Sequence, residues 1–255
     1  GMARRIAVLN QKGGVGKTTT AVNVAVALAQ KQFRVLLVDL DAQRNATQFL
    51  GLDEADSKFG ADALVLDGTF APVRDVLLPG LDVVPATAQH DLLERRLFGD
   101  AVAGPKKFKR ALNGVPERYD FVVTDCGPTL GMLALNAVVA CPEVLIPIEL
   151  AHAATVGALT LRQWLDAVRL DVEPLVRVLG VLPTFADDRE RTPREMLATL
   201  RRVFGEDLFK TVIHTCAAIR DAAGRGRPVV LDAPQSRGAV EYQSLTQEVI
   251  SRGNP

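Results

Sequence analysis

The chain has 255 residues with 30 basic and 30 acidic side chains, so its formal net charge is zero and predicts no overall attraction to nucleic acid or membranes. Its hydrophobic content of 48% is typical of a globular protein with a sizeable core. Three scattered cysteines and three scattered histidines argue against a disulfide framework, a cysteine-ligated cluster or a metal site of these residues, and favour a reducing cytoplasm.

Short apolar runs alternate with stretches of helical periodicity along most of the chain. The runs predict buried strands at residues 6–9, 34–39, 81–86, 119–125, 143–148, 176–184 and 208–213. The periodic stretches predict helices that include residues 18–30, 130–140, 155–170, 192–204 and 236–251. Residues 52–75 show neither pattern and are expected to form an insertion or mobile loop. Apolar strands alternating with helices predict an α/β fold, a doubly wound and mostly parallel sheet flanked by helices, in a single domain spanning residues 1–255.

The sequence NQKGGVGKTTT (10–20) lies between the first predicted strand and the first predicted helix, where a phosphate-binding loop belongs. Lys17 and Thr18 end the pattern G-x-x-x-x-G-K-[ST], but Gln11 stands where its first glycine is expected. Backbone N–H groups at a helix N-terminus bind phosphates, and glycines let the backbone approach them closely. We expect Lys17 on the β- and γ-phosphates and the Thr18 hydroxyl on Mg²⁺. The expected nucleotide-binding residues are Gly13, Gly14, Val15, Gly16, Lys17, Thr18 and Thr19.

Two further predicted strands end in carboxylates. Asp39 and Asp41 follow the apolar run VLLV (35–38), and Asp125 ends YDFVVTD (119–125). Because parallel strands bind ligands at their carboxyl ends, all three side chains are expected to face the phosphates. Asp125 suits a water bound to Mg²⁺, and Asp41 suits the attacking water. Capping of the next helix or turn is the alternative, and it is strongest for Asp39.

Four stretches resemble the ParA/Soj group of chromosome and plasmid partition ATPases, within the deviant Walker A class of P-loop NTPases that also includes MinD. They are KGGVGKTT (12–19), VDLDAQRNAT (38–47), YDFVVTDCGPTLG (119–131) and LNAVVACPEVLIPI (135–148), and residues 226–250 also resemble the end of these proteins. The resemblance implies a slow ATPase that uses ATP and Mg²⁺ and forms a homodimer on ATP binding. It further implies non-specific DNA binding by that dimer, a ParB-type partner that stimulates hydrolysis, and a cytoplasmic, nucleoid-associated protein.

Lys12 matches the signature lysine of this group, which the resemblance implies crosses the dimer interface to the partner's nucleotide. A cation arriving in trans would stabilise charge on the phosphates, as an arginine finger does. The alternative is a solvated lysine that contacts its own nucleotide. We therefore expect Lys12, Lys17 and Asp41 to form the catalytic set.

Three loop residues depart from the pattern of the group. Gly127 stands where D-C-P-P has proline, and Ala42 and Arg44 stand where D-x-D-P-Q-G-N has proline and glycine. Glycine loosens a loop relative to proline. These departures bear on the timing of hydrolysis rather than on nucleotide binding.

Candidate DNA contacts are basic residues that neutralise phosphates without reading sequence. Acidic neighbours dilute several of them, and charge runs on helices are commonly solvated faces. Too few residues precede the first strand for a helix-turn-helix, so we expect no such domain and no operator recognition. Near residue 214, where relatives carry a basic residue, this chain has Thr215. The candidates are Arg189, Arg191, Arg220, Arg225 and Arg227, with a second patch at PKKFKR (105–110).

Two other functions share these motifs. A MinD-like, membrane-associated positioning ATPase needs a basic amphipathic C-terminal helix. Tyr242, Leu245 and Val249 instead have core-like spacing, so a packed helix and no membrane partner are expected. A non-partition P-loop ATPase of the same fold, such as a biosynthetic ligase, is the second alternative. The sequence has no N-K-x-D guanine signature, which favours ATP.

Overall fold

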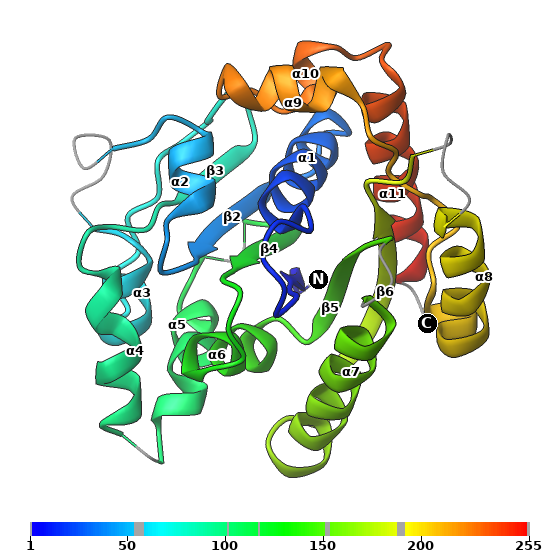
Figure 1. The fold of residues 1–255 in the computed structure, drawn as a ribbon. Helices are drawn as coiled ribbons and strands as arrows, with labels where there is room; N and C mark the ends of the chain where they lie inside the picture. The colour runs from blue at the N-terminus through cyan, green and yellow to red at the C-terminus, as the bar shows by residue number, and fades with distance from the viewer. Residues whose placement is uncertain are drawn as a thin grey trace.

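The fold is built on one six-stranded sheet in a computed structural model that describes residues 2–53, 59–100, 102–116, 118–150, 154–187 and 192–253. The strands are all parallel and follow the order β3-β2-β4-β1-β5-β6 (Figure 1). This arrangement confirms the predicted α/β fold. The strands are β1 (Arg4–Val8), β2 (Val35–Leu40), β3 (Leu81–Val84), β4 (Phe121–Cys126), β5 (Glu143–Glu149) and β6 (Arg177–Thr184).

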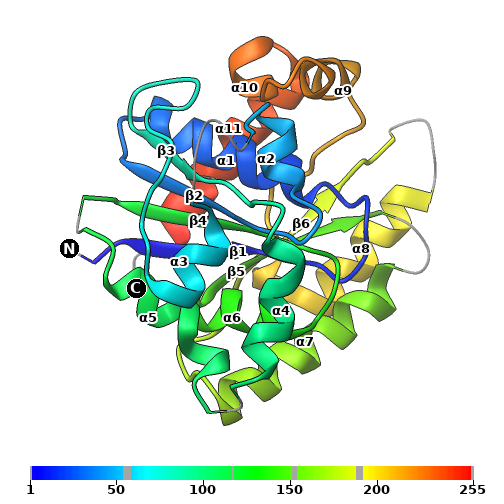
Figure 2. The same ribbon diagram turned by 90° about the vertical axis from the view of Figure 1, so that its left-hand side faces the viewer.

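Helices cover both faces of the sheet (Figure 2). The first face carries α1 (Lys17–Gln30), α2 (Asn45–Phe49), α9 (Ala217–Gly224), α10 (Val229–Asp232) and α11 (Arg237–Arg252). The second face carries α3 (Ala61–Asp67), α4 (His90–Phe98), α5 (Lys107–Asn113), α6 (Met132–Ala140), α7 (Ala154–Asp171) and α8 (Thr192–Phe204). Two 3₁₀ turns, η1 (Gly104–Lys106) and η2 (Gly205–Asp207), precede α5 and follow α8.

The strands read as continuous apolar runs because both faces of the sheet are buried. Successive side chains of a strand point to opposite faces. Ile6 and Val8 therefore pack toward α1 and α11, whereas Ala7 and Leu9 pack in the cluster under the second layer of helices. Residues 20–29 of α1 are buried all round, since this helix lies between the sheet and its neighbours.

The predicted seventh strand at residues 208–213 is wrong. This segment runs beside β6 but forms a single isolated bridge with it among the described residues, between Leu208 and Val181. Phe209 and Ile213 donate backbone N–H bonds to the carbonyls of Val181 and Pro183, at 2.9 Å each. Pro183 has no N–H to return a bond, so a regular ladder cannot continue along this edge.

The expectation of an irregular loop over residues 52–75 is wrong for part of that segment, and residues 54–58 lie outside the described residues. Helix α3 occupies Ala61–Asp67 and buries Ala61, Leu64 and Val65 against the second face. Their spacing of three and four residues is the signal for a short amphipathic helix. The sequence pattern was therefore present, although brief.

The C-terminal helix is packed, as predicted. The Ser236 hydroxyl caps α11 by accepting the Ala239 N–H, and Tyr242, Leu245 and Val249 are fully buried. Within the described ranges, no helix combines the length and the apolar character that crossing a membrane requires.

Arg252 in the last turn of α11 fastens this helix to the sheet edge. Its Nη1 donates to the carbonyls of Leu179 and Asp207 at 3.0 and 3.1 Å, and its Nη2 donates to Leu208 O at 2.8 Å. The guanidinium also lies 4.3 Å from the centre of the Phe209 ring.

We therefore expect Arg252→Ala to lower the free energy of unfolding by about 2–4 kcal/mol, because three carbonyls lose a charged donor. Urea unfolding followed by circular dichroism measures the change. Arg201→Ala, at an exposed position of α8, is the control and should change stability by no more than about 0.5 kcal/mol. Equal effects of the two variants would contradict this role.

Candidate functional site

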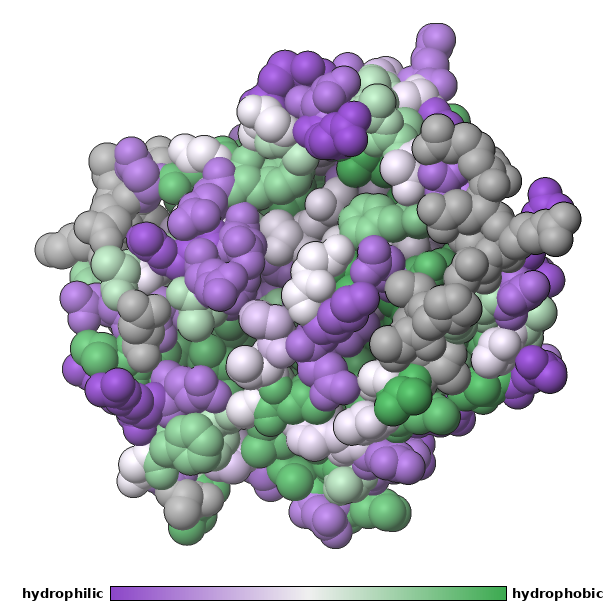
Figure 3. All heavy atoms as spheres, in the orientation of Figure 1, coloured by the Kyte–Doolittle hydropathy of each residue, from purple (hydrophilic) through white to green (hydrophobic). Residues whose placement is uncertain are grey.

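A cleft of about 560 Å³ opens at the carboxyl ends of the strands, beside the loop that joins β1 to α1. Open parallel sheets bind ligands at this edge. Figure 3 shows the molecule in the orientation of Figure 1, with hydrophilic side chains gathered around α2 and over α9 and α10. The cleft is lined by Gly13, Gly14, Gly16, Lys17, Thr18, Thr19, Asp41, Gln43, Asn45, Gln48, Phe49, Pro128 and Phe185.

The glycine loop leads directly into α1 and forms an open cradle. Gly16 caps the helix with φ of 84°, a left-handed conformation that favours glycine. A Cβ placed on Gly13 or Gly14 would meet nothing within 4 Å, so both backbones are open to the cleft. Val15 is buried, and its carbonyl accepts the Thr184 hydroxyl of β6 at 3.0 Å. The loop is thus held by the sheet on one side and open on the other.

Lys17 turns its ammonium into this loop. Its Nζ donates to the Lys12 carbonyl at 2.8 Å, and the side chain is largely buried. Burial lowers the pKa of Lys17, and the carboxylates of Asp125 and Asp41 oppose that shift. A phosphate group would add negative charge beside this buried cation and so stabilise it further.

Asp125 and Thr18 meet beneath the loop. Thr18 Oγ1 donates to Asp125 Oδ2 at 2.7 Å. Asp125 is fully buried, and its Oδ1 has no hydrogen-bond partner within the described part of the chain. Burial, followed by the nearby Asp39 carboxylate, raises the pKa of Asp125 well above its usual value. Oxygen ligands suit Mg²⁺, so this pair fits a magnesium ion held by Thr18 and, through water, by Asp125.

Asp41 lines the same cleft and is held by its own loop. Its Oδ1 accepts the Gln43 N–H at 3.0 Å, and its Oδ2 accepts the Asn45 side-chain amide. The side chain is 2% exposed although it lines the cleft. The structure thus brings Asp41 together with Lys17 and Thr18, as the sequence predicts.

Of the three aspartates expected to face the phosphates, Asp41 alone lines the cleft, which corrects that expectation. Asp125 is buried behind Thr18, and Asp39 is held by Thr47 of α2. Asp39 is fully buried, and its Oδ2 accepts both the backbone N–H and the hydroxyl of Thr47, at 2.8 and 2.6 Å. Its Oδ1 accepts the Asp41 N–H at 3.0 Å. Burial raises the pKa of Asp39 to about 6, and these hydrogen bonds oppose the rise. Asp39 therefore anchors α2 and the Asp41 loop, as the capping alternative predicts.

Lys12 directly precedes Gly13, the first residue of the cleft lining, and pairs with a carboxylate of β5. Its Nζ is 2.8 Å from Glu149 Oε2 at the end of β5, and half of the Lys12 side chain is exposed. The loop is further tied to α7 because the Gln11 amide donates to Gly157 O at 3.3 Å. Glu149 was not recognised from the sequence, although it directly follows the strand predicted at residues 143–148 and ends β5 at the ligand-binding edge.

The predicted DNA-binding arginines divide into two groups. Arg189 and Arg191 lie outside the described residues. Arg220, Arg225 and Arg227 are exposed at α9 and the turn that follows it, apart from the cleft lining. The guanidinium groups of Arg225 and Arg227 both contact Asp232, and this carboxylate offsets part of their positive charge.

The second basic patch is also partly neutralised. Lys107 Nζ lies 3.7 Å from Asp100, and Lys109 pairs with the buried Glu173. Ion pairs of this kind reduce the charge that remains for a phosphate backbone.

Two aromatic residues of the cleft were missed by the sequence reasoning. Phe49 ends α2, and Phe185 directly follows β6 with φ of 56°, a left-handed value that is uncommon for a bulky residue. The ring of Phe185 would lie 3.1 Å from a Cβ on Gly16. Phe185 directly follows a predicted parallel strand, and that position is the sequence feature that indicates a cleft residue.

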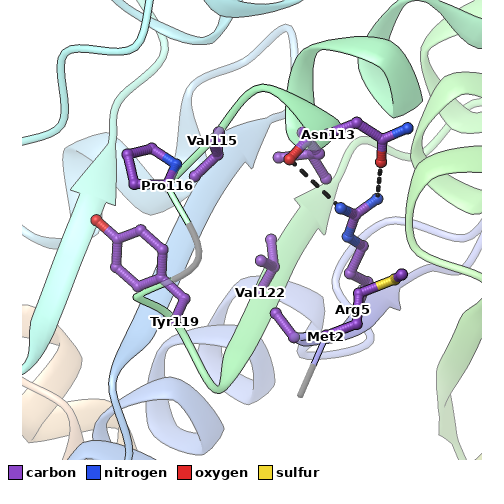
Figure 4. Close-up of a pocket in the computed structure, with 9 residues that line it drawn as sticks. Met2, Arg5, Asn113, Val115, Pro116, Tyr119 and Val122 are labelled. Carbon is purple, nitrogen blue, oxygen red and sulfur yellow. Dashed lines mark hydrogen bonds between the residues drawn. The ribbon is translucent and has the colours of Figure 1, made fainter.

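A second cavity, of about 280 Å³, lies at the opposite edge of the sheet (Figure 4). Arg5 lines one side of it and donates to Asn113 Oδ1 at 3.1 Å and to Leu112 O at 3.3 Å. The remaining lining is largely apolar and includes Val115 and Val122. Its place at the amino ends of β1 and β4 makes it a weaker ligand site than the cleft.

The hydroxyl of Thr47 links three segments, since it donates to Asp39 and accepts the Ala86 N–H at 2.8 Å. We expect Thr47→Val to lower the free energy of unfolding by about 2 kcal/mol, because Ala86 N–H and Asp39 each lose a buried partner. Thr47→Ser keeps the hydroxyl and should lose about 1 kcal/mol or less. Chemical denaturation measures both values. Equal losses in the two variants would show that the hydroxyl is not what matters.

Comparisons with known proteins agree with this geometry. A family model described as "AAA domain" matches residues 3–178. The chain is 38% identical to "Sporulation initiation inhibitor protein Soj" of Bacillus subtilis (strain 168), over 99% of this chain and 100% of that protein. It is 39% identical to "Chromosome-partitioning ATPase Soj" of Thermus thermophilus, over 98% of this chain and 96% of that protein.

Among solved structures, the chain resembles one named cobyrinic acid a,c-diamide synthase of Mycobacterium smegmatis, with bound ADP and magnesium. The TM-score is 0.78 and the identity 30%, over 96% of this chain and 93% of that one. Full-length identity to the two Soj proteins, together with the loop, strand and carboxylate positions, assigns the family. The chain belongs to the Soj/ParA family of chromosome-partitioning ATPases.

Proposed function

We propose that this protein is a single-domain DNA-partition ATPase. In this proposal it dimerises when ATP binds, the dimer binds DNA non-specifically, and ATP hydrolysis releases the DNA. The observation that carries the proposal is that the glycine loop, Lys17, Thr18 and Asp41 line one cleft. Asp125 lies buried behind Thr18 and accepts its hydroxyl. Full-length similarity to a protein named as a chromosome-partitioning ATPase supports chromosome partition as the process that uses this ATPase.

In this proposal the phosphates lie along the backbone of Gly13 to Thr19. The backbone N–H groups and the start of α1 supply partial positive charge, and Lys17 supplies a full one. Thr18 directly and Asp125 through a water would hold Mg²⁺, which offsets phosphate charge when bound. The Mycobacterium smegmatis neighbour with bound ADP and magnesium supports a nucleotide and a magnesium ion here.

Asp41 is the proposed residue that orients the attacking water. Its two carboxylate oxygens already accept from Gln43 N–H and from Asn45. Each oxygen has a second lone pair and can still accept from water. Because the carboxylate is held within its own loop, we propose that intrinsic turnover is slow until the loop moves.

Lys12 is the proposed contact across the dimer. In one chain its ammonium pairs with Glu149, but both side chains are substantially exposed. Such a surface pair contributes about 0–1 kcal/mol, so phosphate charge from a second subunit can replace it. Two nucleotides held between two copies would attract both cleft faces, and the attraction would fall after phosphate release.

The proposed partners are nucleoid DNA, which the dimer binds without sequence specificity, and a ParB-type protein that stimulates ATP hydrolysis. Arg220, Arg225 and Arg227 are the described candidates for phosphate contacts, and Arg189 and Arg191 remain candidates beyond the described part. A dimer presents each patch twice, which strengthens salt-sensitive binding.

Lys17→Ala should abolish ATP binding, because the buried phosphate contact is lost, and isothermal titration calorimetry measures this.

Lys12→Ala should bind ATP within about threefold of wild type but form no ATP-dependent dimer by light scattering, because its charge acts on the partner's nucleotide. The matched control is Lys31→Ala, at an exposed position after α1. Normal dimers of Lys12→Ala would remove its role in trans.

DNA binding should require ATP and fall steeply with salt, because the contacts are to phosphates. Sedimentation with duplex DNA in ATP, ADP and no nucleotide, at two salt concentrations, measures this. Arg225→Ala together with Arg227→Ala should weaken binding without changing ATP affinity. Equal binding in ATP and ADP would reject a nucleotide switch.

A biosynthetic ATP-dependent ligase is the second candidate, because the Mycobacterium smegmatis neighbour is named a diamide synthase and has ADP and magnesium bound. A ligase consumes ATP only when its carboxylic acid substrate and an amide nitrogen donor are present. ATP turnover without either, and its stimulation by DNA with a ParB-type protein, would favour partition. A MinD-like membrane role has less support, since the apolar residues of α11 are buried in the core.

A further inference from the structure

Gly127 lies directly after Asp125 and Cys126, where the chain leaves β4. A Cβ placed on Gly127 would lie 2.8 Å from Asp41 Oδ1, 3.6 Å from Asp41 Cγ and 3.8 Å from Asp41 Cα. The first separation is shorter than real Cβ contacts, so a side chain at residue 127 requires either Asp41 or the loop at residue 127 to shift. The loop after β4 and the loop after β2 therefore touch at this point.

Backbone conformation does not account for a glycine here. The glycines with positive φ in the described chain include Gly14, Gly16 and Gly226, and Gly127 is not among them. An alanine at residue 127 would therefore fit the local backbone. The steric constraint comes from Asp41 instead.

Asp41 has little freedom to give way. Its Oδ1 is bound to Gln43 N–H and its Oδ2 to Asn45, while its own N–H donates to the buried Asp39. The side chain is 2% exposed, so a rotation displaces packed neighbours rather than solvent. A methyl group at residue 127 would therefore break the Gln43 bond, shift the Asp41 backbone or displace the loop at residue 127.

We propose that Gly127 is a positioning residue, which sets the place of the Asp41 carboxylate by leaving room for it at the end of β4. This inference rests on the proposed ATPase function, in which Asp41 orients the attacking water. It makes the Asp125 loop and the Asp41 loop one mechanical unit, since a shift of either changes the gap between Gly127 and Oδ1.

The first test is Gly127→Ala in the full chain. We expect kcat for ATP hydrolysis to fall about tenfold while KM stays within about twofold, because only the water-orienting group is displaced. The ¹H–¹⁵N resonance of the Gln43 amide should shift, since its acceptor moves. Gly114→Ala, whose Cβ would meet only Ala111 O at 3.4 Å, is the control and should leave all three readings unchanged.

The second test is a stability cycle with Asp41→Ala, which needs no activity. Gly127→Ala should lower the melting temperature in the wild-type background and have no effect when Asp41→Ala has removed the carboxylate. If Gly127→Ala alone does not fold, folding of the double variant supports the proposal and its failure overturns it. Equal losses in both backgrounds also overturn it.

The kinetic measurements test whether Gly127 affects ATP hydrolysis through Asp41. An unchanged kcat overturns the positioning role, whether or not the Gln43 resonance moves. A lower kcat with an unmoved Gln43 resonance overturns it too, because the effect would not pass through Asp41. A wild-type protein without ATPase activity would refute the proposed function, and the stability cycle would still report on the contact.

Discussion

The site depends on charges that the fold takes out of water beneath the glycine loop. Lys17 and Asp125 are both buried, and the carboxylate of Asp39 lies beside Asp125 in the sheet register. Burial raises the pKa of Asp125 well above its usual value, raises the pKa of Asp39 to about 6 and lowers the pKa of Lys17. Each shift reflects the cost of keeping an ion in a medium of low polarity.

This cost is offset only in part by hydrogen bonds within the chain. Thr18 bonds one oxygen of Asp125 and leaves the other without a partner among the described residues. A metal ion would reduce the repulsion between the carboxylates, and phosphates would add negative charge beside the buried lysine. Buried ionisable groups with shifted pKa values are typical of functional sites. Here they match a ligand that combines negatively charged phosphates with a positively charged metal ion.

The loops around the cleft are connected by contacts between distant parts of the chain. Thr184 of β6 holds the glycine loop through Val15 O, at a separation of 169 residues. Thr47 joins the end of β2 to the loop after β3. Gly127 leaves the space that Asp41 occupies. Because these contacts run between loops at one sheet edge, a ligand that moves one loop acts on the others.

Local sequence patterns determined the six strands, the main helices, the glycine loop and the approach of Asp41 and Asp125 to it. Strand runs, helical spacing and the loop motif are short-range features, and the parallel topology brings the strand ends together. Tertiary structure alone decided the inward turn of Asp39, the pairing of Lys12 with Glu149, and the packing of Phe185 on Gly16. It also decided that residues 208–213 form no regular strand, since Pro183 interrupts their pairing with β6. These features depend on which distant residue lies opposite, and a one-dimensional pattern carries no such information.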